Sequence, residues 1–282
     1  MSRPLYFIRS KHAVTPIYFN GFRVALGEDT PALLTSERTI LSSPPGNLVI
    51  TKRFSGASFL RKAKTHGHCI IYVCSDVFCA KPKRLHRLFE THYEAFDRII
   101  FPNQRTLEDF GRSTGRESVL IEVSQDAHRL RTCRVGFDQL KAGYFGNRQN
   151  RPAKVPGLPR DFLQRIDPYF SHAQFLEHGS DYNLHVSLRK TPEEVQYKPS
   201  PKILNAAYTD VPVLIQKGHM AELFGTEYPF YLENFDSWDA LADRFSDQGE
   251  ITHALETMRS IRSEHGLETF QRKIREIFAS LA

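Results

Sequence analysis

The chain has 282 residues, of which 40% are hydrophobic and 25% are charged, and Lys and Arg outnumber Asp and Glu by 38 to 32. This composition is ordinary for a globular protein and excludes wholesale disorder, collagen and coiled coil. No stretch approaches the roughly 20 apolar residues of a membrane helix, and the first apolar run is too short for a signal peptide, so we expect a cytoplasmic protein.

Short apolar runs alternate with helical patterns in the first half of the chain, which is typical of strand–helix–strand units in a parallel sheet. The predicted strands are Leu5–Ile8, Leu48–Thr51, Cys69–Cys74, Arg98–Phe101 and Val119–Val123. The predicted helices are Pro16–Leu26, Ala57–Thr65, Pro82–Phe96 and Gln104–Thr114. We therefore expect a Rossmann-like domain over residues 1–130.

The same alternation begins again in the second half. Its predicted strands are Leu140–Phe145, Leu184–Leu188, Val211–Ile215 and Phe230–Leu232, and its predicted helices are Pro159–Ile166, Pro201–Thr209 and Ser237–Phe245. This predicts a second Rossmann-like domain over residues 131–262, with a cleft between the two sheets. His265 and Gly266 divide the helical tail, and the mixed charge of its polar face favours packing of residues 263–282 on the protein rather than on a membrane.

The positive charge is concentrated in the first half. Residues 1–141 carry 22 Lys and Arg against 13 Asp and Glu, whereas residues 142–282 carry 16 against 19. The clusters that we single out contain Arg61, Lys62, Lys83, Arg84 and Arg87. Such clusters attract phosphate groups, anionic lipid headgroups or nucleic acid, and a solvated face without a partner is the alternative.

Histidines and cysteines lie close together around the third predicted strand, as in zinc sites. The strand places Cys69 and Cys74 on opposite faces, however, so we expect no metal. Four cysteines in a chain of this length without a secretory signal do not predict a disulfide framework, so we expect free thiols.

The segment before the predicted helix Pro201–Thr209 is suited to binding phosphate. Ser200 is a good N-cap and Pro201 a good first helical residue, so the helix amides point at a loop flanked by Lys198 and Lys202. In a parallel sheet such a loop lies at the carboxyl edge, where ligands bind.

The run from Lys198 and Pro199 through Lys202 to Asn205 and Ala206, followed by Val211-Pro212-Val213, resembles the donor-site segment of a bacterial branch of GT-B type glycosyltransferases. The stretch 142–147 is similar to the glycine-bearing first turn of their donor domain. The resemblance implies two Rossmann-like domains that face each other across a cleft, with C-terminal helices crossing back to the first domain. It also implies that the second domain holds a nucleotide-sugar donor.

Donor-binding candidates follow from this resemblance and from charge. They are Gly146, Asn147, Arg148, Arg189, Lys190, Tyr197, Lys198, Pro199, Ser200, Lys202 and Asn205. Cations and helix amides stabilise a departing nucleoside diphosphate without metal, and the chain has no Asp-x-Asp motif, so we expect neither metal nor cofactor. Tyr197 and Asn205 stand where many retaining members carry a glutamate pair, which leaves the donor and the stereochemical outcome open.

An inverting transferase also needs a base that takes the acceptor proton. Asp76, just after a predicted strand, is the first candidate and His12 the second; a turn cap is the alternative for Asp76.

We therefore expect transfer of a sugar from a nucleotide-sugar to an acceptor. The basic first half favours an anionic glycan or a lipid-linked intermediate, with peripheral contact at the inner membrane surface. The alternative is a non-catalytic protein on the same scaffold that binds a polyanion or, less favoured, nucleic acid.

Overall fold

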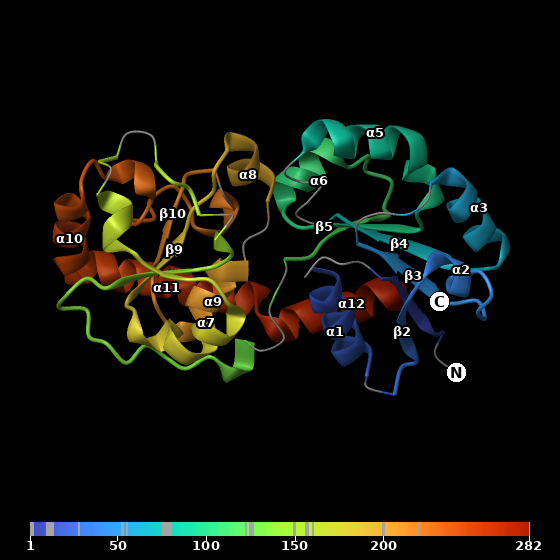
Figure 1. Ribbon diagram of the computed structural model, residues 1–282, viewed down its shortest axis with the longest axis horizontal. Helices are drawn as coiled ribbons and strands as arrows, with labels where there is room; N and C mark the ends of the chain where they lie inside the picture. Colours follow the sequence, from blue (N-terminus) through green and yellow to red (C-terminus); the bar gives the residue numbers. More distant parts are fainter. Residues whose placement is uncertain are drawn as a thin grey trace. The chain divides into compact units, whose positions relative to one another are not determined.

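The protein divides into two compact units, which are described separately (Figure 1). Unit 1 comprises Met1–Gln125, Tyr197–Pro199 and Leu267–Ala282, and unit 2 comprises Asp126–Gln196 and Ser200–Gly266. The computed structural model describes all residues except 1–2, 10–13, 28, 52–53, 55, 75–80, 122, 124–126, 149–150, 156–157, 160, 199–200, 219 and 282, and except the side chains of 14–17, 128, 172 and 221. No helix in the described ranges is long and apolar enough to cross a membrane.

Unit 1 contains a six-stranded parallel sheet with the order β2-β1-β3-β4-β5-β6. Its strands are β1 (Leu5–Ile8), β2 (Ala32–Thr35), β3 (Asn47–Ile50), β4 (Cys69–Val73), β5 (Arg98–Phe101) and β6 (Glu117–Val119). The central strands are short continuous apolar runs, as expected for strands buried on both faces.

Six α-helices of unit 1 surround this sheet in the described part of the chain. They are α1 (Val14–Leu26), α2 (Glu37–Ile40), α3 (Ala57–Thr65), α5 (Pro82–His92), α6 (Gln104–Phe110) and α12 (Leu267–Ala279), with a 3-10 turn at Tyr93–Ala95. The helix α12 packs on α1: the rings of Phe22 and Phe278 lie 5.7 Å apart edge to face, and Arg275 donates a hydrogen bond to the carbonyl of Ala25 at 3.3 Å. A helix from the end of the chain thus completes the unit that the first residues began.

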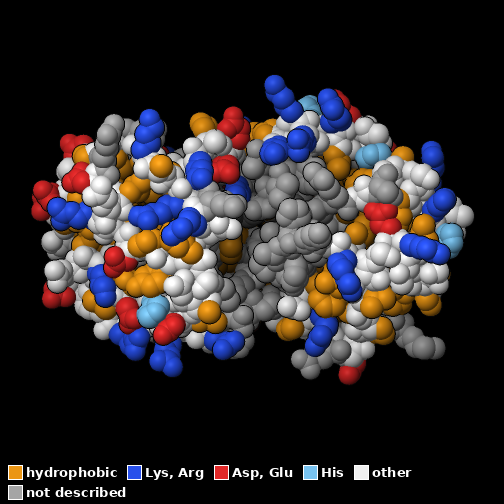
Figure 2. All heavy atoms as spheres, in the orientation of Figure 1, with side chains coloured by type: hydrophobic (Ala, Val, Ile, Leu, Met, Phe, Trp, Pro, Cys, Tyr) orange, Lys and Arg blue, Asp and Glu red, His pale blue; other side chains and the backbone are white. Residues whose placement is uncertain are grey.

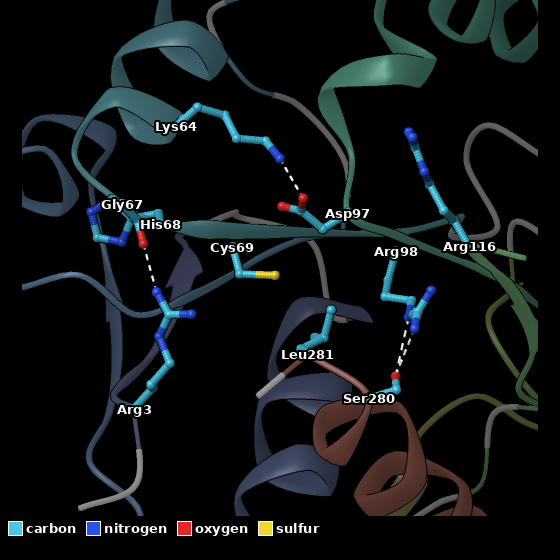
Figure 3. A pocket seen from close by; sticks show the side chains of 10 residues that line it. All are labelled: Arg3, Lys64, Gly67, His68, Cys69, Asp97, Arg98, Arg116, Ser280 and Leu281. Atoms are coloured by element: carbon cyan, nitrogen blue, oxygen red, sulfur yellow. Dashed lines mark hydrogen bonds and ion pairs between the residues drawn. The ribbon is translucent and has the colours of Figure 1, made fainter. Parts of the chain in front are cut away.

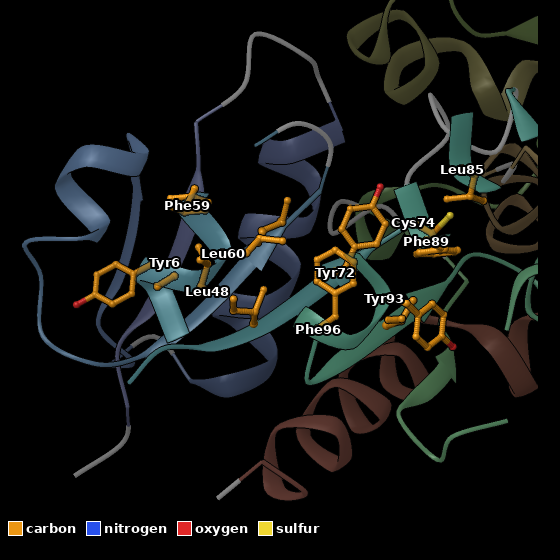
Figure 4. Packing of buried hydrophobic residues seen from close by; sticks show 14 of the residues in the cluster. Tyr6, Leu48, Phe59, Leu60, Tyr72, Cys74, Leu85, Phe89, Tyr93 and Phe96 are labelled. Carbon is orange, nitrogen blue, oxygen red and sulfur yellow. The ribbon is translucent and has the colours of Figure 1, made fainter. Parts of the chain in front are cut away.

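Aromatic side chains from β4, α5 and the turn after it fill one side of the core of unit 1 (Figure 4). The rings of Tyr72 and Phe96 stack at 4.9 Å, and Phe89 meets Tyr93 edge to face at 5.2 Å. Leu85 and Phe89 are four residues apart and therefore share the buried face of α5. Lys83, Arg84 and Arg87 of the same helix remain exposed.

Unit 2 contains a four-stranded parallel sheet with the order β10-β9-β7-β8. Its strands are β7 (Ala142–Phe145), β8 (Asp167–Tyr169), β9 (Leu184–Ser187) and β10 (Val213–Ile215). The strand β8 lies on one side of β7 and β9 on the other, so the order reverses between β7 and β9. Such a topological switch point leaves a crevice outside the carboxyl ends of the two strands.

Five α-helices of unit 2 are described. They are α7 (His172–His178), α8 (Pro192–Tyr197, whose last residue belongs to unit 1), α9 (Pro201–Thr209), α10 (Trp238–Ser246) and α11 (Gln248–His265). Shorter 3-10 turns lie at Ala127–Arg129, Phe162–Arg165, Gly179–Asp181, Ala221–Leu223 and Leu232–Asn234. The helix α11 packs on α9, and Arg259 forms two hydrogen bonds with Asp210, at 3.0 and 2.9 Å.

Several predicted elements are confirmed and a few are wrong. The strands Leu5–Ile8 and Arg98–Phe101 and the helices Ala57–Thr65 and Pro201–Thr209 have the predicted bounds, and α11 ends at His265. The apolar run after Val119 is not a strand: Leu120, Ile121 and Val123 are buried as loop residues, and β6 lies earlier. Phe230–Leu232 forms only a single bridge at Tyr231, and the predicted helix Pro159–Ile166 is a 3-10 turn.

The described cysteines are free thiols, as expected. Cys69 is half-buried at the start of β4, Cys74 is buried just after it, and Cys133 lies near the carbonyl groups of Val135 and Tyr182. Burial, and after it the nearby carboxylate of Asp97, together raise the pKa of Cys69 to about 12. The thiol of Cys69 is therefore protonated at neutral pH.

Candidate functional site

Four segments of unit 2 bring polar side chains to the switch point of its sheet. Gly146 follows β7, Arg189 follows β9 after one residue, and Gln216 follows β10. Lys202 and Asn205 stand in the first two turns of α9, whose opposite face is buried. The carboxyl edge of this sheet therefore carries two cations, two amides and a glycine.

The closest approach in this group joins Gly146 and Lys202. A Cβ atom added to Gly146 would lie 2.6 Å from Cε and 2.8 Å from Nζ of Lys202, so a larger residue at this position would displace the end of the lysine side chain. The ammonium group lies over the ring of Tyr144, 4.0 Å from its centroid. Backbone and ring together fix the position of the charge at the end of β7.

Tyr144 connects this lysine to two arginines. Burial raises the pKa of Tyr144 to about 12, even though the charges of Arg189 and Arg151 favour the ionised form. The neutral hydroxyl donates a hydrogen bond to the carbonyl of Asn147 at 3.3 Å, which holds the loop after β7. Arg189 is only 5% exposed, and its backbone N–H donates to Oε1 of Gln216 at 2.6 Å, which ties the ends of β9 and β10 together.

Asn205 presents an acceptor toward the interior. Its Oδ1 atom is shielded from solvent and accepts no hydrogen bond from the described part of the chain. A buried amide oxygen in this condition costs free energy unless a partner arrives. A ligand hydroxyl is one such partner.

The loop after β7 also borders a pocket of about 670 Å³ at the ends of β7 and β8. Arg148 is exposed and lies over the ring of Phe170, 5.0 Å from its centroid. Arg151 donates hydrogen bonds to the carbonyl groups of Leu163 and Ile166, so its guanidinium is fixed in the wall. Arg148 and Arg151 thus add positive charge beside Gly146 and Lys202.

Sequence reasoning missed Tyr144, Arg151 and Gln216 as site residues. Tyr144 lies inside a strand and looks like core. Gln216 directly follows a predicted strand, and that position was the available signal.

Other predicted donor residues lie elsewhere or are less constrained. Lys190 is exposed, and its backbone N–H donates to Glu194 at 3.1 Å. Tyr197 belongs to unit 1, where its hydroxyl donates to Asp109 at 2.7 Å and its carbonyl accepts a hydrogen bond from Asn103 at 3.2 Å. Lys198 is buried and is grouped with the same unit.

The two catalytic candidates, Asp76 and His12, lie outside the described residues, as do Pro199 and Ser200. The acceptor-surface candidates are described. Arg61 and Lys62 are exposed on α3, and Lys83, Arg84 and Arg87 are exposed on α5. Figure 2 shows Lys and Arg side chains gathered over the α5 region.

No group of three or more His, Cys, Asp and Glu side chains in the described ranges is placed to hold a metal ion.

Solved structures that match nearly the whole chain include glycosyltransferases. HepE from Anabaena, solved in complex with UDP, matches with a TM-score of 0.68 at 12% identity, over 99% of this chain and 100% of its own. The chain has a GT-B fold. AviGT4, a glycosyltransferase involved in avilamycin A biosynthesis, matches with a TM-score of 0.58 at 11% identity, over 99% of this chain and 98% of its own.

A variant of the T4 phage protein BGT, solved with UDP-glucose, matches with a TM-score of 0.52 at 10% identity, over 100% of this chain and 98% of its own. No protein-family model matches the sequence, and no curated protein matches it.

Proposed function

We propose that this protein is a glycosyltransferase that takes a sugar from a nucleotide-sugar donor bound at the switch point of unit 2. The observation that carries the proposal is the position of the Lys202 ammonium beside Gly146 and over Tyr144, at the sheet edge where ligands of this topology bind. HepE and BGT, which share the fold, were solved with UDP and UDP-glucose. A uridine nucleotide is therefore the first donor to test.

The chemistry assigned to the donor residues is stabilisation of the leaving diphosphate. Negative charge grows on this group as the glycosidic bond breaks, and preorganised cations in a partly dry site lower the barrier. Lys202 and Arg189 supply that charge, and the first amides of α9 add to it. Asn205 supplies the acceptor for a ribose hydroxyl.

The proposed mechanism uses neither a metal nor a cofactor. Transfer should then persist in EDTA, because the leaving group is neutralised by side chains. The proposed acceptor is an anionic glycan or a lipid-linked intermediate, drawn to the basic faces of α3 and α5.

Calorimetry with UDP tests the donor site. Lys202→Ala should weaken UDP binding about ten- to a hundredfold, the worth of a charge-assisted hydrogen bond. Lys198→Ala, predicted from the sequence motif, should behave similarly, and Asn205→Ala should cost less because it removes a neutral bond. Lys141→Ala is the matched control, because Lys141 also lies over a tyrosine ring, that of Tyr182 at 4.7 Å, but precedes β7.

Unchanged UDP affinity in Lys202→Ala would refute the donor site. UDP binding without donor-dependent release of UDP would instead favour a non-catalytic binding protein on the same scaffold. The observation that favours this second candidate function is the identity of residue 205. It is an asparagine, where many retaining members of the resembling family carry a glutamate.

The catalytic base is tested separately with Asp76→Asn. A base acts on the acceptor proton in the transition state, so this variant should keep the parent's UDP affinity and lose transfer. Full transfer would remove Asp76 from the mechanism and turn attention to His12→Ala.

A further inference from the structure

Unit 1 also has a polar pocket. It lies at the edge of the sheet opposite to the carboxyl ends of the strands (Figure 3). Its volume is about 490 Å³. Arg3 precedes β1, Arg98 opens β5 and Arg116 precedes β6, while Ser280 follows α12. Lys64 lies in the last turn of α3, so the pocket is built by the amino ends of the strands and the ends of two helices.

The lining of this pocket is strongly cationic. Arg3, Lys64, Arg98 and Arg116 face it together with a single carboxylate, that of Asp97. One oxygen of Asp97 pairs with Lys64, and the other accepts the backbone N–H of Ile70 at 2.7 Å. The carboxylate of Asp97 is thus occupied by one lysine and one amide, and among the described residues it forms no ion pair with the three guanidinium groups of the lining.

Two of these guanidinium groups are held in place by the chain itself. Arg98 donates to Oγ of Ser280 from Nε and Nη2, at 3.2 and 2.8 Å, and to the carbonyl of Gly115 at 2.9 Å. Arg3 donates from Nη2 to the carbonyl of Gly67 at 2.6 Å. Figure 3 shows these two groups on either side of Cys69 and Leu281. Neutral partners fix their position and leave their charge uncompensated.

Arg116 differs, because it forms an ion pair with Glu94 at 3.0 Å. It contributes a positive rim to the pocket rather than an uncompensated charge.

We propose that this pocket binds a small phosphate-bearing anion and is separate from the donor site. A guanidinium has five N–H donors, and only one hydrogen bond from Arg3 and three from Arg98 go to the described part of the chain. Donors that line one pocket from different strands suit a tetrahedral dianion, which accepts hydrogen bonds on several oxygens. A chloride ion offers one charge and no such geometry.

Titration of inorganic phosphate at constant ionic strength, followed by calorimetry, tests the proposal. The titration is made in the Lys202→Ala background, and again in the parent with saturating UDP, so that phosphate binding at the donor site does not contribute. One phosphate should bind per chain in both. Arg3→Ala should weaken it about tenfold or more, and Ser280→Glu should abolish it by placing a carboxylate against Arg98.

Arg38→Ala is the matched control, because Arg38 is an exposed arginine of unit 1 outside the pocket. It should leave phosphate affinity unchanged. The proposal is overturned if no phosphate binds. It is also overturned if Arg3→Ala and Ser280→Glu bind phosphate as tightly as the protein without these substitutions. Because Arg3→Ala should keep the parent's UDP affinity, a failure here is distinguishable from a failure of the donor site.

The source of the phosphate is settled by competition. Displacement by glycerol 3-phosphate but not by phosphatidic acid vesicles indicates a soluble phosphate ester. Displacement by the vesicles, with none by phosphatidylcholine vesicles, indicates a lipid headgroup. Either result supports the pocket.

Discussion

Gly146 matters because it has no Cβ atom. The space that a Cβ would occupy is taken by the end of the Lys202 side chain. The ammonium group lies between this backbone and the ring of Tyr144, where the face of the ring favours a positive charge. The glycine thus leaves the lysine its place at the end of β7.

The ionised carboxylate of Glu117 contributes to the stability of unit 1. Burial alone would raise its pKa, but hydrogen bonds from the hydroxyl of Tyr93 and from the backbone N–H groups of Arg112 and Thr114 lower it to about 2. The carboxylate therefore holds the 112–114 loop against the ring of Tyr93, over which Arg112 lies at 4.3 Å.

Because the folded-state pKa lies below the unfolded one, this contribution is fully present above about pH 4.5 and is lost as the pH falls toward 2. Glu117→Gln should cost about 1.5–3 kcal/mol of the free energy of unfolding at pH 7. It should also flatten the acid limb of the stability curve, measured by urea unfolding at several pH values. Glu108→Gln, on the exposed face of α6, is the control and should keep the slope. The same acid limb in Glu117→Gln as in the parent would contradict this role.

At the level of elements, the helix α5 has a buried apolar face and an exposed basic face. Leu85 and Phe89 enter the core, which leaves Lys83 and Arg87 in solvent. The double reversal Lys83→Glu/Arg87→Glu should weaken association with anionic vesicles, and increasingly so at low salt, because exposed charges act within a Debye length of about 8–10 Å. UDP affinity should not change. Vesicle co-sedimentation and calorimetry measure the two effects.

The matched control for this reversal is Lys154→Glu/Arg165→Glu in unit 2, where both residues are exposed. If both double variants lose vesicle binding equally, the loss is explained by the change in net charge and not by the position of the charges on α5. Loss of UDP binding in the α5 variant would contradict the assignment of the donor to unit 2.

The strands that sequence reasoning missed or misplaced are strands at sheet edges. The edge strands β2 and β8 are partly exposed, and β8 reads Asp-Pro-Tyr, which has neither an apolar run nor a full set of ladder donors. The edge strand β6 begins with Glu117 rather than in the apolar run that follows. In contrast, β10 is also an edge strand but is fully buried, and its apolar run predicted it.

Of the candidate site, too, the sequence predicted some residues and missed others. Charge, capping and strand ends predicted Arg189 and Lys202, and the family resemblance predicted Gly146; the structure brings all three to one switch point. The orientation of Tyr144 could not be predicted, because strand residues alternate between faces and both faces here are buried: Phe145 packs with Phe175, whereas Tyr144 meets Lys202. Which buried aromatic touches a ligand-binding lysine depends on helix placement, which the strand sequence does not contain.

At the scale of the whole molecule, unit 1 depends on a helix from the far end of the chain. Phe270, Ile274 and Ile277 of α12 are buried, and each buried apolar side chain of this size contributes about 1.5–3 kcal/mol. A chain that stops after Gly266 should therefore lose the cooperative unfolding transition of unit 1. Unit 2 keeps all its residues and should still be stabilised by UDP, as measured by thermal unfolding with and without nucleotide.

Removal of residues 281–282 alone is the control for this truncation and should leave both transitions in place. Unchanged unfolding of unit 1 without α12 would show that the helix is dispensable.

The packing of α12 on unit 1 also determines when unit 1 can complete its folding during synthesis. The ribosome makes β1 to β6 first, then all of unit 2, and only then α12. At about 5–20 residues per second, the first sheet waits many seconds with the face of α1 around Phe22 uncovered. Nascent unit 1 is thus exposed to chaperones and proteases for longer than nascent unit 2, although it is translated first.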